Sequence, residues 1–370
     1  MTLPRKPARP ALFARRASAL LLLPLFALLG GCQAVLLSPS GDVALQQRNL
    51  MLVSTALMLM IVVPVMALIV YVAWRYRATN QASEAEYAPE WNHSLPLEVA
   101  IWTAPLLIII AIGAITWLST HLLDPFRPLG RIDTNRHIPQ LTEPLQVEVV
   151  ALDWKWLFIY PELGIASLNE MAAPVDRPIS FRITASHVMN SFYVPALAGQ
   201  IYAMPAMQTQ LHAVINEPGA YKGFSANYSG AGFARMTFTF HGLEDSDFDK
   251  WVAKAKSQGT GLDRAVYTEI AKPSEADPVR YFSTVEKGLF NAIVNMCTAP
   301  GQMCVDEMMR IDAKGGAGVH SRENRERLRY DRVRDVPGHG AGHETPAAPA
   351  PGANGGHQGH GGPAPAKSGI

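Results

Sequence analysis

Two hydroxyl groups, one aromatic ring and one thioether recur at short intervals in the segment 225–236. They belong to Ser225, Ser229, Phe233 and Met236. Side chains at such intervals can meet around one metal ion, and copper is held by thiolates and imidazoles. Serine hydroxyls have pKa values far above neutral, a phenyl ring offers no ligand atom, and one thioether does not hold copper alone. The segment therefore predicts a loop without metal.

The spacing itself resembles the copper-binding loop in subunit II of cytochrome c oxidase, which reads Cys-x3-Cys-x3-His-x2-Met. In that family a further histidine lies upstream, in a strand ending His-Ser-Trp-x-Val-Pro, and a backbone carbonyl completes the ligand set. The resemblance places Asn190 at the upstream histidine and Asn227 at the carbonyl ligand. It implies that the chain keeps the scaffold of a copper site but not its thiolates and imidazoles.

A scaffold of this kind without copper ligands resembles subunit II of the cytochrome bo-type ubiquinol oxidases. The resemblance covers roughly residues 28–290, and its further motifs are DWKWLFIYPE at 153–162, VMNSF at 188–192, QIYAM at 200–204, MQT at 207–209 and NEPG at 216–219. It implies a cupredoxin-like Greek-key β-barrel, in a subunit of a proton-pumping oxidase of the aerobic respiratory chain.

The family also implies cofactors and partners. Its electrons pass from ubiquinol to haem and copper centres in subunit I, so this chain is expected to bind no cofactor and not to meet cytochrome c. Its expected partners are subunit I, the smaller membrane subunits and the lipid bilayer. A tryptophan near Trp154 receives electrons in copper-bearing relatives, but without copper we expect a structural role for Trp154.

Two other functions fit parts of the sequence. The chain could be a cytochrome c oxidase subunit with a working copper site, but the absent ligands weigh against this. It could instead be a free lipoprotein that handles copper through a histidine-rich tail. Two apolar segments with internal prolines weigh against that function, because proline in a membrane helix indicates protein neighbours that satisfy the freed carbonyls.

The composition separates an apolar first third from a more polar remainder. The chain has 370 residues, of which 48% are hydrophobic, and a formal net charge of +1. A membrane anchor followed by a soluble part is expected. Nothing in the charge pattern indicates nucleic acid as a partner.

The amino terminus has the pattern of a bacterial lipoprotein signal. Basic residues between Arg5 and Arg16 precede an apolar run at 19–29, and Leu-Leu-Gly-Gly directly precedes Cys32. We expect a signal peptide at 1–31 and an acylated Cys32, carrying chains such as palmitate, as the mature amino terminus. The alternative is an ordinary first membrane helix over 17–37 with an incidental cysteine.

A transmembrane hairpin is expected over residues 32–125, with helices at about 50–74 and 96–121. Each segment is long enough to cross a hydrocarbon core of about 30 Å. Arg75 and Arg77 follow the first helix, which by the positive-inside rule places the connecting loop in the cytoplasm. The soluble domain is then periplasmic, on a protein of the bacterial inner membrane.

Glu98 is the charged residue near the cytoplasmic start of the second helix. A carboxylate in a first turn is stabilised by the helix dipole by about 0.3–1 kcal/mol, which is one explanation. The other comes from the family resemblance: haem-copper oxidases carry a glutamate seven residues before the helix proline, near a proton channel of subunit I. Glu98 keeps that interval to Pro105, which makes it a candidate for the proton entrance.

Short runs of β-branched or alternating residues follow between 126 and 243, separated by turn residues, and indicate an antiparallel sandwich or barrel. Helical spacing then predicts short helices at 247–256, 261–271 and 278–296, within an extension at 244–313. The last segment, 314–370, is rich in His, Gly, Pro and Ala. Such a composition predicts disorder, although its histidines could capture stray copper or zinc.

Cys297 and Cys304 flank a turn-rich hexapeptide. In an oxidising periplasm a disulfide closing this short loop is the expected pairing. Free thiols remain an alternative, while a metal site is disfavoured because no histidine lies nearby and the spacing is not one used for zinc.

Overall fold

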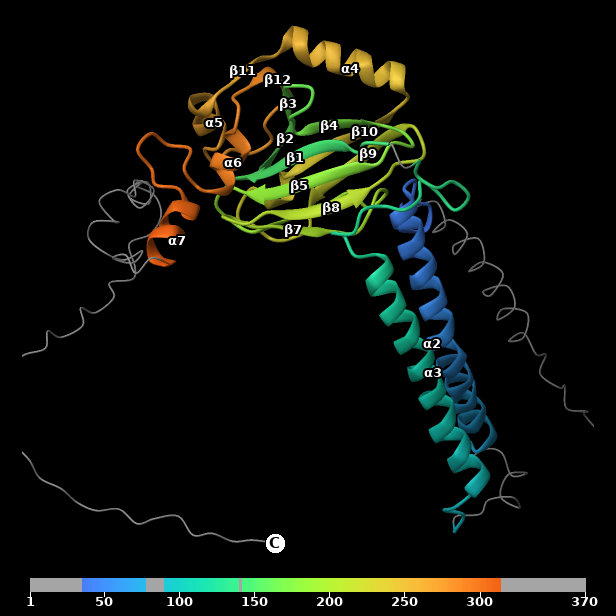
Figure 1. The fold of residues 1–370 in the computed structure, drawn as a ribbon. Coiled ribbons are helices and arrows are strands. Elements are labelled where there is room, and N and C mark those ends of the chain that lie inside the picture. Colours follow the sequence, from blue (N-terminus) through green and yellow to red (C-terminus); the bar gives the residue numbers. More distant parts are fainter. Residues whose placement is uncertain (1–34, 78–89, 140–141, 314–370) are drawn as a thin grey trace, which may run out of the picture. The chain divides into compact units, whose positions relative to one another are not determined.

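The computed structural model describes residues 35–77, 90–139 and 142–313 (Figure 1). Cys32 and the histidine-rich tail lie outside these residues. The described chain begins with a short 3-10 turn, η2 (Val35–Leu37), and two long helices, α2 (Asp42–Arg75) and α3 (Leu95–Leu122). Both helices are long and apolar enough to cross a membrane, judged by length and composition.

Helix α2 is longer than its apolar stretch because its first turn is docked on the soluble domain. Residues 42–44 are buried. Gly41 forms an antiparallel bridge with Ile215. The Asp42 carboxylate accepts two hydrogen bonds from the Arg131 guanidinium, at 2.8 and 2.9 Å. Such a bidentate pair fixes direction as well as distance, so the start of α2 is held firmly.

The soluble domain is a sandwich of two sheets. The larger sheet has the strand order β11-β12-β3-β2-β1-β5-β8 and the smaller one β4-β10-β9-β6-β7. The strands of the larger sheet are β1 (Leu145–Leu152), β2 (Lys155–Tyr160), β3 (Ile165–Leu168), β5 (Ile179–Ala185), β8 (Thr209–Ala213), β11 (Thr260–Leu262) and β12 (Arg280–Val285). Those of the smaller sheet are β4 (Glu170–Pro174), β6 (Asn190–Tyr193), β7 (Ile201–Ala203), β9 (Gly219–Ser225) and β10 (Thr237–Leu243).

This arrangement confirms the expected cupredoxin-like barrel but corrects its strand pairing. Strands β1 and β5 run parallel, as do β10 and β4, so the sandwich is mixed and not wholly antiparallel. Parallel neighbours need a crossover connection, and a Greek-key path supplies one.

Aromatic rings fill the space between the sheets. Trp156, Phe158, Phe192 and Phe238 are all buried. Phe192 from β6 and Phe238 from β10 are stacked with their centroids 5.5 Å apart, and Trp156 meets both rings. Strand β10 alternates between partly and fully buried residues, as expected for a strand with one covered face.

The C-terminal extension packs around the larger sheet, with α5 and α6 over its outer face and α4 against β12, β3 and β4. It contains α4 (Asp245–Gln258), α5 (Arg264–Ile270), α6 (Leu289–Val294) and α7 (Val305–Ala313). Apolar residues of α5 and α6 pack in one cluster with outward-facing residues of β1 and β2. This explains why every residue of β2 is buried.

One expected helix of the extension is partly wrong. Residues 280–285, inside the expected helix at 278–296, form strand β12 and pair antiparallel with β3. Only the second part of that segment, α6, is helical. The edge of β3 offers hydrogen-bonding partners to this segment, and such long-range pairing overrides local helical spacing.

Candidate functional site

The residues at the copper-ligand positions meet at one end of the smaller sheet. Asn190 is the first residue of β6 and Ser225 the last of β9, and these strands pair antiparallel. The Ser225 hydroxyl donates to the Asn190 amide oxygen at 2.9 Å and also lies 3.2 Å from the Asn227 carbonyl oxygen. Asn190 and Ser225 are 1% and 3% exposed, so this polar contact is sealed from water.

The amide groups of this site are satisfied by backbone carbonyls. The Asn190 amide nitrogen donates to the Val188 carbonyl oxygen at 3.1 Å, and that of Asn227 donates to the Met189 carbonyl oxygen at 3.1 Å. Because Asn190 is buried, leaving its amide without a partner would cost about 1–3 kcal/mol, so its bond to Val188 stabilises the site as it stands.

The other ligand positions are filled by packing contacts. The Ser229 hydroxyl donates to the buried sulfur of Met236 at 3.9 Å. Phe233 begins the 3-10 turn η4 (Phe233–Arg235), and its ring meets that of Tyr228 edge to face, with centroids 5.6 Å apart. The family resemblance assigned these residues to one set of ligand positions, and the structure places them around the loop at 225–236.

Trp154 closes this loop from the β1–β2 turn. Its indole nitrogen donates to the Ser229 carbonyl oxygen at 3.0 Å. A Cβ atom at Gly232 would lie 2.4 Å from the indole ring, so only glycine fits there. Trp154 has a φ of 65°, a left-handed conformation that costs energy in a non-glycine residue. These contacts give Trp154 a packing role in the loop.

These residues do not fit a dinuclear copper centre. The side chains are amides, hydroxyls, a phenyl ring and a single thioether, and the polar ones among them already bond to one another or to the backbone. Within the described ranges, no group of three or more His, Cys, Asp or Glu side chains is placed to hold a metal ion.

Glu98 lies in the first turn of α3, where its backbone nitrogen bonds to the Ser94 carbonyl oxygen. Its side chain has a partner that sequence reasoning missed: the His93 Nδ1 atom lies 2.6 Å from the Glu98 Oε1 atom. Both groups are open to solvent, at 66% and 44% exposure. His93 lies before the start of α3 and five residues from Glu98, so the spacing of residues within a helix could not predict this contact.

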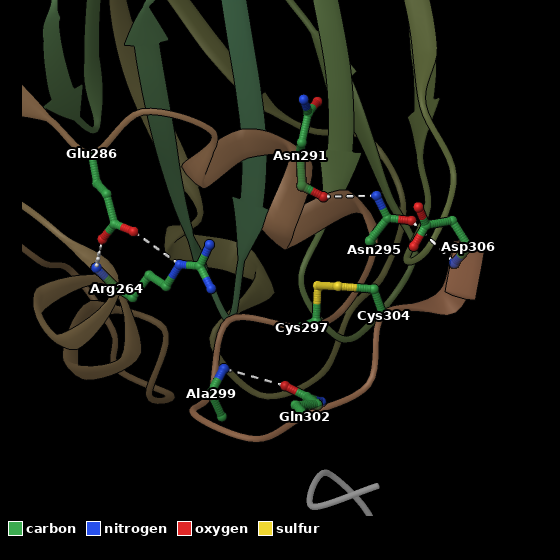
Figure 2. Close-up of a disulfide and its surroundings, with 9 residues drawn as sticks. All are labelled: Arg264, Glu286, Asn291, Asn295, Cys297, Ala299, Gln302, Cys304 and Asp306. Carbon is green, nitrogen blue, oxygen red and sulfur yellow. Dashed lines mark hydrogen bonds and ion pairs between the residues drawn. A yellow bond between two sulfur atoms is a disulfide. The ribbon is translucent and has the colours of Figure 1, made fainter. Parts of the chain in front are cut away.

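Cys297 and Cys304 are joined by a disulfide, shown in Figure 2. Between them, the Ala299 backbone nitrogen bonds to the Gln302 side chain at 3.3 Å. Asn295 then holds the first turn of α7, since its side-chain oxygen accepts from the Asp306 backbone nitrogen at 3.3 Å. The disulfide and Asn295 together attach α7 to the end of α6.

A second polar cluster joins the extension to the barrel. The Glu170 carboxylate of β4 accepts hydrogen bonds from Trp251 of α4 at 2.8 Å and from Tyr281 of β12 at 2.5 Å. His241 of β10 lies 3.5 Å from its other oxygen. Burial raises the pKa of Glu170, but the bonds from His241, Tyr281 and Trp251 outweigh it and lower this pKa to about 2.

Comparison with known proteins defines the class. The family "Cytochrome C oxidase subunit II, periplasmic domain" matches residues 160–242, and "COX Aromatic Rich Motif" matches residues 256–301. The first match covers most of the barrel, including the loop at 225–236. Together with two apolar helices, it indicates a membrane-anchored chain whose soluble domain is periplasmic.

Curated relatives narrow the class to one branch. The cytochrome bo(3) ubiquinol oxidase subunit 2 of Pseudomonas putida is 50% identical over 72% of this chain and 82% of its own length. That of Pseudomonas aeruginosa is 45% identical over 80% and 83%, and the ubiquinol oxidase subunit 2 of Acetobacter aceti is 49% identical over 72% and 84%. The chain belongs to the ubiquinol oxidase subunit 2 family.

Proposed function

We propose that this chain is the non-redox subunit II of a proton-pumping ubiquinol oxidase of the aerobic respiratory chain. The observation that carries the proposal is the buried contact of Ser225 with Asn190, which joins two copper-ligand positions by a hydrogen bond. Neither group is a copper ligand of the required softness. The chain is part of an oxidoreductase only within its complex.

In this function, electrons go from ubiquinol to haem and copper centres in subunit I without passing through the periplasmic domain. The chain stabilises subunit I and the smaller membrane subunits, and covers the periplasmic side of the complex. A docking site for cytochrome c is then unnecessary. The close contact between the Trp154 indole and Gly232 supports a packing role for this tryptophan, in place of a role in receiving electrons.

The proposed topology has two membrane spans in a bacterial inner membrane. Residues 1–31 are a signal peptide and Cys32 is the acylated amino terminus, so the start of α2 lies on the periplasmic side. Arg75 and Arg77 put the α2–α3 connection in the cytoplasm. The barrel, the extension and the tail after residue 313 are periplasmic.

Glu98 is proposed to collect protons at the cytoplasmic side for a channel in subunit I. The contact with His93 supports this role, because an imidazole and a carboxylate 2.6 Å apart can pass a proton between them. Imidazole and carboxylate groups are common proton donors and acceptors in proteins, which fits a place at a proton entrance.

The test is to purify the complex in mild detergent and measure which electron donor it oxidises. We expect oxygen consumption with ubiquinol and none with reduced cytochrome c, and no copper in the chain when it is produced without subunit I. Stoichiometric copper in the separate chain, or turnover with cytochrome c, would contradict the proposal and favour a cytochrome c oxidase subunit. A chain that never co-purifies with haem would favour a free copper-handling lipoprotein.

A further inference from the structure

A small groove lies where the start of α2 meets the segment after β6. It has a volume of about 90 Å³. Its lining combines the polar side chains of Gln47 and Arg48 with the mainly apolar ones of Leu36, Ala44, Met51, Tyr193 and Pro195. The groove has room for a few methylene groups of one acyl chain. Arg48 is the positively charged residue among those that line the groove.

The groove lies at the level where α2 becomes fully apolar. Met51 and Leu52, at 42% and 48% exposure, are the first exposed apolar residues of the helix. Arg48 precedes Met51 by less than one turn, about 4.5 Å along the axis. This change in composition puts the expected boundary between polar headgroups and hydrocarbon at the level of the groove.

The η2 turn beside the groove is also suited to lipid. Val35, Leu36 and Leu37 are 47%, 52% and 51% exposed, although the barrel surface is close by. The Leu37 carbonyl oxygen accepts from the Arg48 guanidinium at 3.3 Å, which holds η2 at the level of Arg48. Three exposed aliphatic side chains at this level favour contact with acyl chains.

Arg48 has hydrogen-bonding capacity left for an anion. Its Nε and Nη2 atoms donate to the Asn49 side-chain oxygen at 3.2 and 2.9 Å, and Nη1 donates to Leu37. A guanidinium has five N–H groups, so two remain. Among the residues that the structure describes, none forms an ion pair with Arg48. A charged group at a membrane boundary without a protein counter-ion favours an anionic partner.

We propose that this groove binds one anionic phospholipid of the outer leaflet, with its phosphate on Arg48 and an acyl chain against Leu36 and Met51. The proposal rests on the proposed topology, which places the start of α2 on the periplasmic side. Guanidinium binds phosphate through hydrogen bonds of its N–H groups, and Arg48 keeps one such group on Nη1 and one on Nη2. A zwitterionic headgroup is expected to bind more weakly, because none of the described residues that line the groove is a carboxylate that could pair with its cation.

The experiment compares lipid retention by the intact complex in native mass spectrometry. The complex is purified in mild detergent and titrated with phosphatidylglycerol or, separately, phosphatidylcholine. We expect wild type to retain one more phosphatidylglycerol than the Arg48→Gln complex, with affinity lowered about tenfold by the loss of a charge-assisted bond. Leu36→Ser, which changes only the apolar lining, should also reduce retention.

Arg127→Gln is the matched control. Arg127 follows the end of α3 and bonds to the His121 carbonyl oxygen at 3.4 Å, but does not line the groove. Equal retention by wild type, Arg48→Gln and Leu36→Ser would overturn the proposal. Increased phosphatidylglycerol binding by Cys32→Ser would also overturn it, because the groove would then hold the chain's own acyl group. Haem content and ubiquinol turnover of the same samples test the proposed function separately.

Discussion

The Ser225 hydroxyl and the Asn190 amide oxygen, 35 positions apart in the chain, lie 2.9 Å from each other in the core. The two residues come from neighbouring strands of one sheet. A hydrogen bond thus connects two positions that the family resemblance assigns to copper ligands. The polar side chains at these positions satisfy one another without a metal. Whether the same backbone can hold copper once the ligands are restored can therefore be tested.

Restoring the ligands should restore a copper centre. We expect the variant with Asn190→His, Ser225→Cys, Ser229→Cys and Phe233→His, and with Met236 kept, to bind two copper ions and become coloured, because two thiolates then bridge the pair. The chain is produced without subunit I, and copper is measured by metal analysis and electron paramagnetic resonance. The same variant without Ser229→Cys is the control and should lack the bridged spectrum. A correctly folded fourfold variant that stays colourless in excess copper would show that these positions are misassigned.

Glu98→Gln should slow ubiquinol turnover without loss of assembly. The change removes a proton acceptor, while the helix loses at most about 1 kcal/mol from its dipole interaction. His93→Gln should act in the same direction, since it breaks the 2.6 Å contact. Oxygen consumption is divided by haem content, with Glu90→Gln, in the exposed segment before α3, as the control. Unchanged turnover of Glu98→Gln at normal haem content would leave Glu98 with only its interaction with the helix dipole.

Cys32 should be the mature amino terminus. Intact mass measurement of the membrane protein is expected to show loss of residues 1–31 and added acyl mass, because small residues directly precede the cysteine. Cys32→Ser should remain uncleaved but stay in the membrane through α2 and α3. A wild-type chain that retains Met1 and carries no acyl group would refute this.

Glu170 should make the soluble domain sensitive to acid. Its pKa is about 2 in the folded protein, against an ordinary value of 4.5. The lowered pKa contributes stability that is complete above about pH 4.5 and is lost as the pH falls toward 2. Because Glu170 is only half buried, solvent screening reduces this contribution to on the order of 1–2 kcal/mol. Thermal unfolding at pH 7 should show Glu170→Gln less stable than wild type, with the difference shrinking at pH 3. Glu162→Gln, on an exposed carboxylate, is the control. A difference that does not vary with pH would contradict the assignment.

Removing the disulfide should release α7. Cys297→Ser opens a loop closed over a separation of seven residues, which is expected to cost about 2 kcal/mol. Limited proteolysis should then cut within 305–313 faster than in wild type, while ubiquinol turnover is kept. Cys304→Ser should behave alike, and reductant should make wild type equally sensitive. Equal protection of α7 in all samples would show that Asn295 and the buried Met308 hold the helix without the disulfide.

The sequence was sufficient for those parts of the fold that depend on motifs and local apolar runs. The spacing between Ser225 and Met236 identified the loop, and two apolar stretches identified α2 and α3. Contacts that depend on where distant strands meet were missed. Examples are the parallel pairing of β1 with β5 and the bonds from Trp251 and Tyr281 to Glu170, which join elements of both sheets and the extension.

The start of α2 was also missed because it depends on a distant contact: the sequence predicted a helix from about residue 50, whereas α2 begins at Asp42. Hydropathy marks where a helix can enter a membrane, whereas the position of Asp42 is decided by its contact with Arg131. Strand β12 likewise forms because β3 offers it an edge. Neither partner can be chosen from a single sequence, because many other residues of the same type are available.

The bridge between Gly41 and Ile215 joins two points that lie before and after the membrane hairpin. The sandwich can complete this edge only when both points have reached the same side of the bilayer. A chain in which just one helix has inserted leaves them on opposite sides, with Asp42 separated from Arg131. With the proposed topology, this bridge and the pair of Asp42 with Arg131 can form only after both helices have inserted, so the docking of α2 on the soluble domain depends on correct insertion.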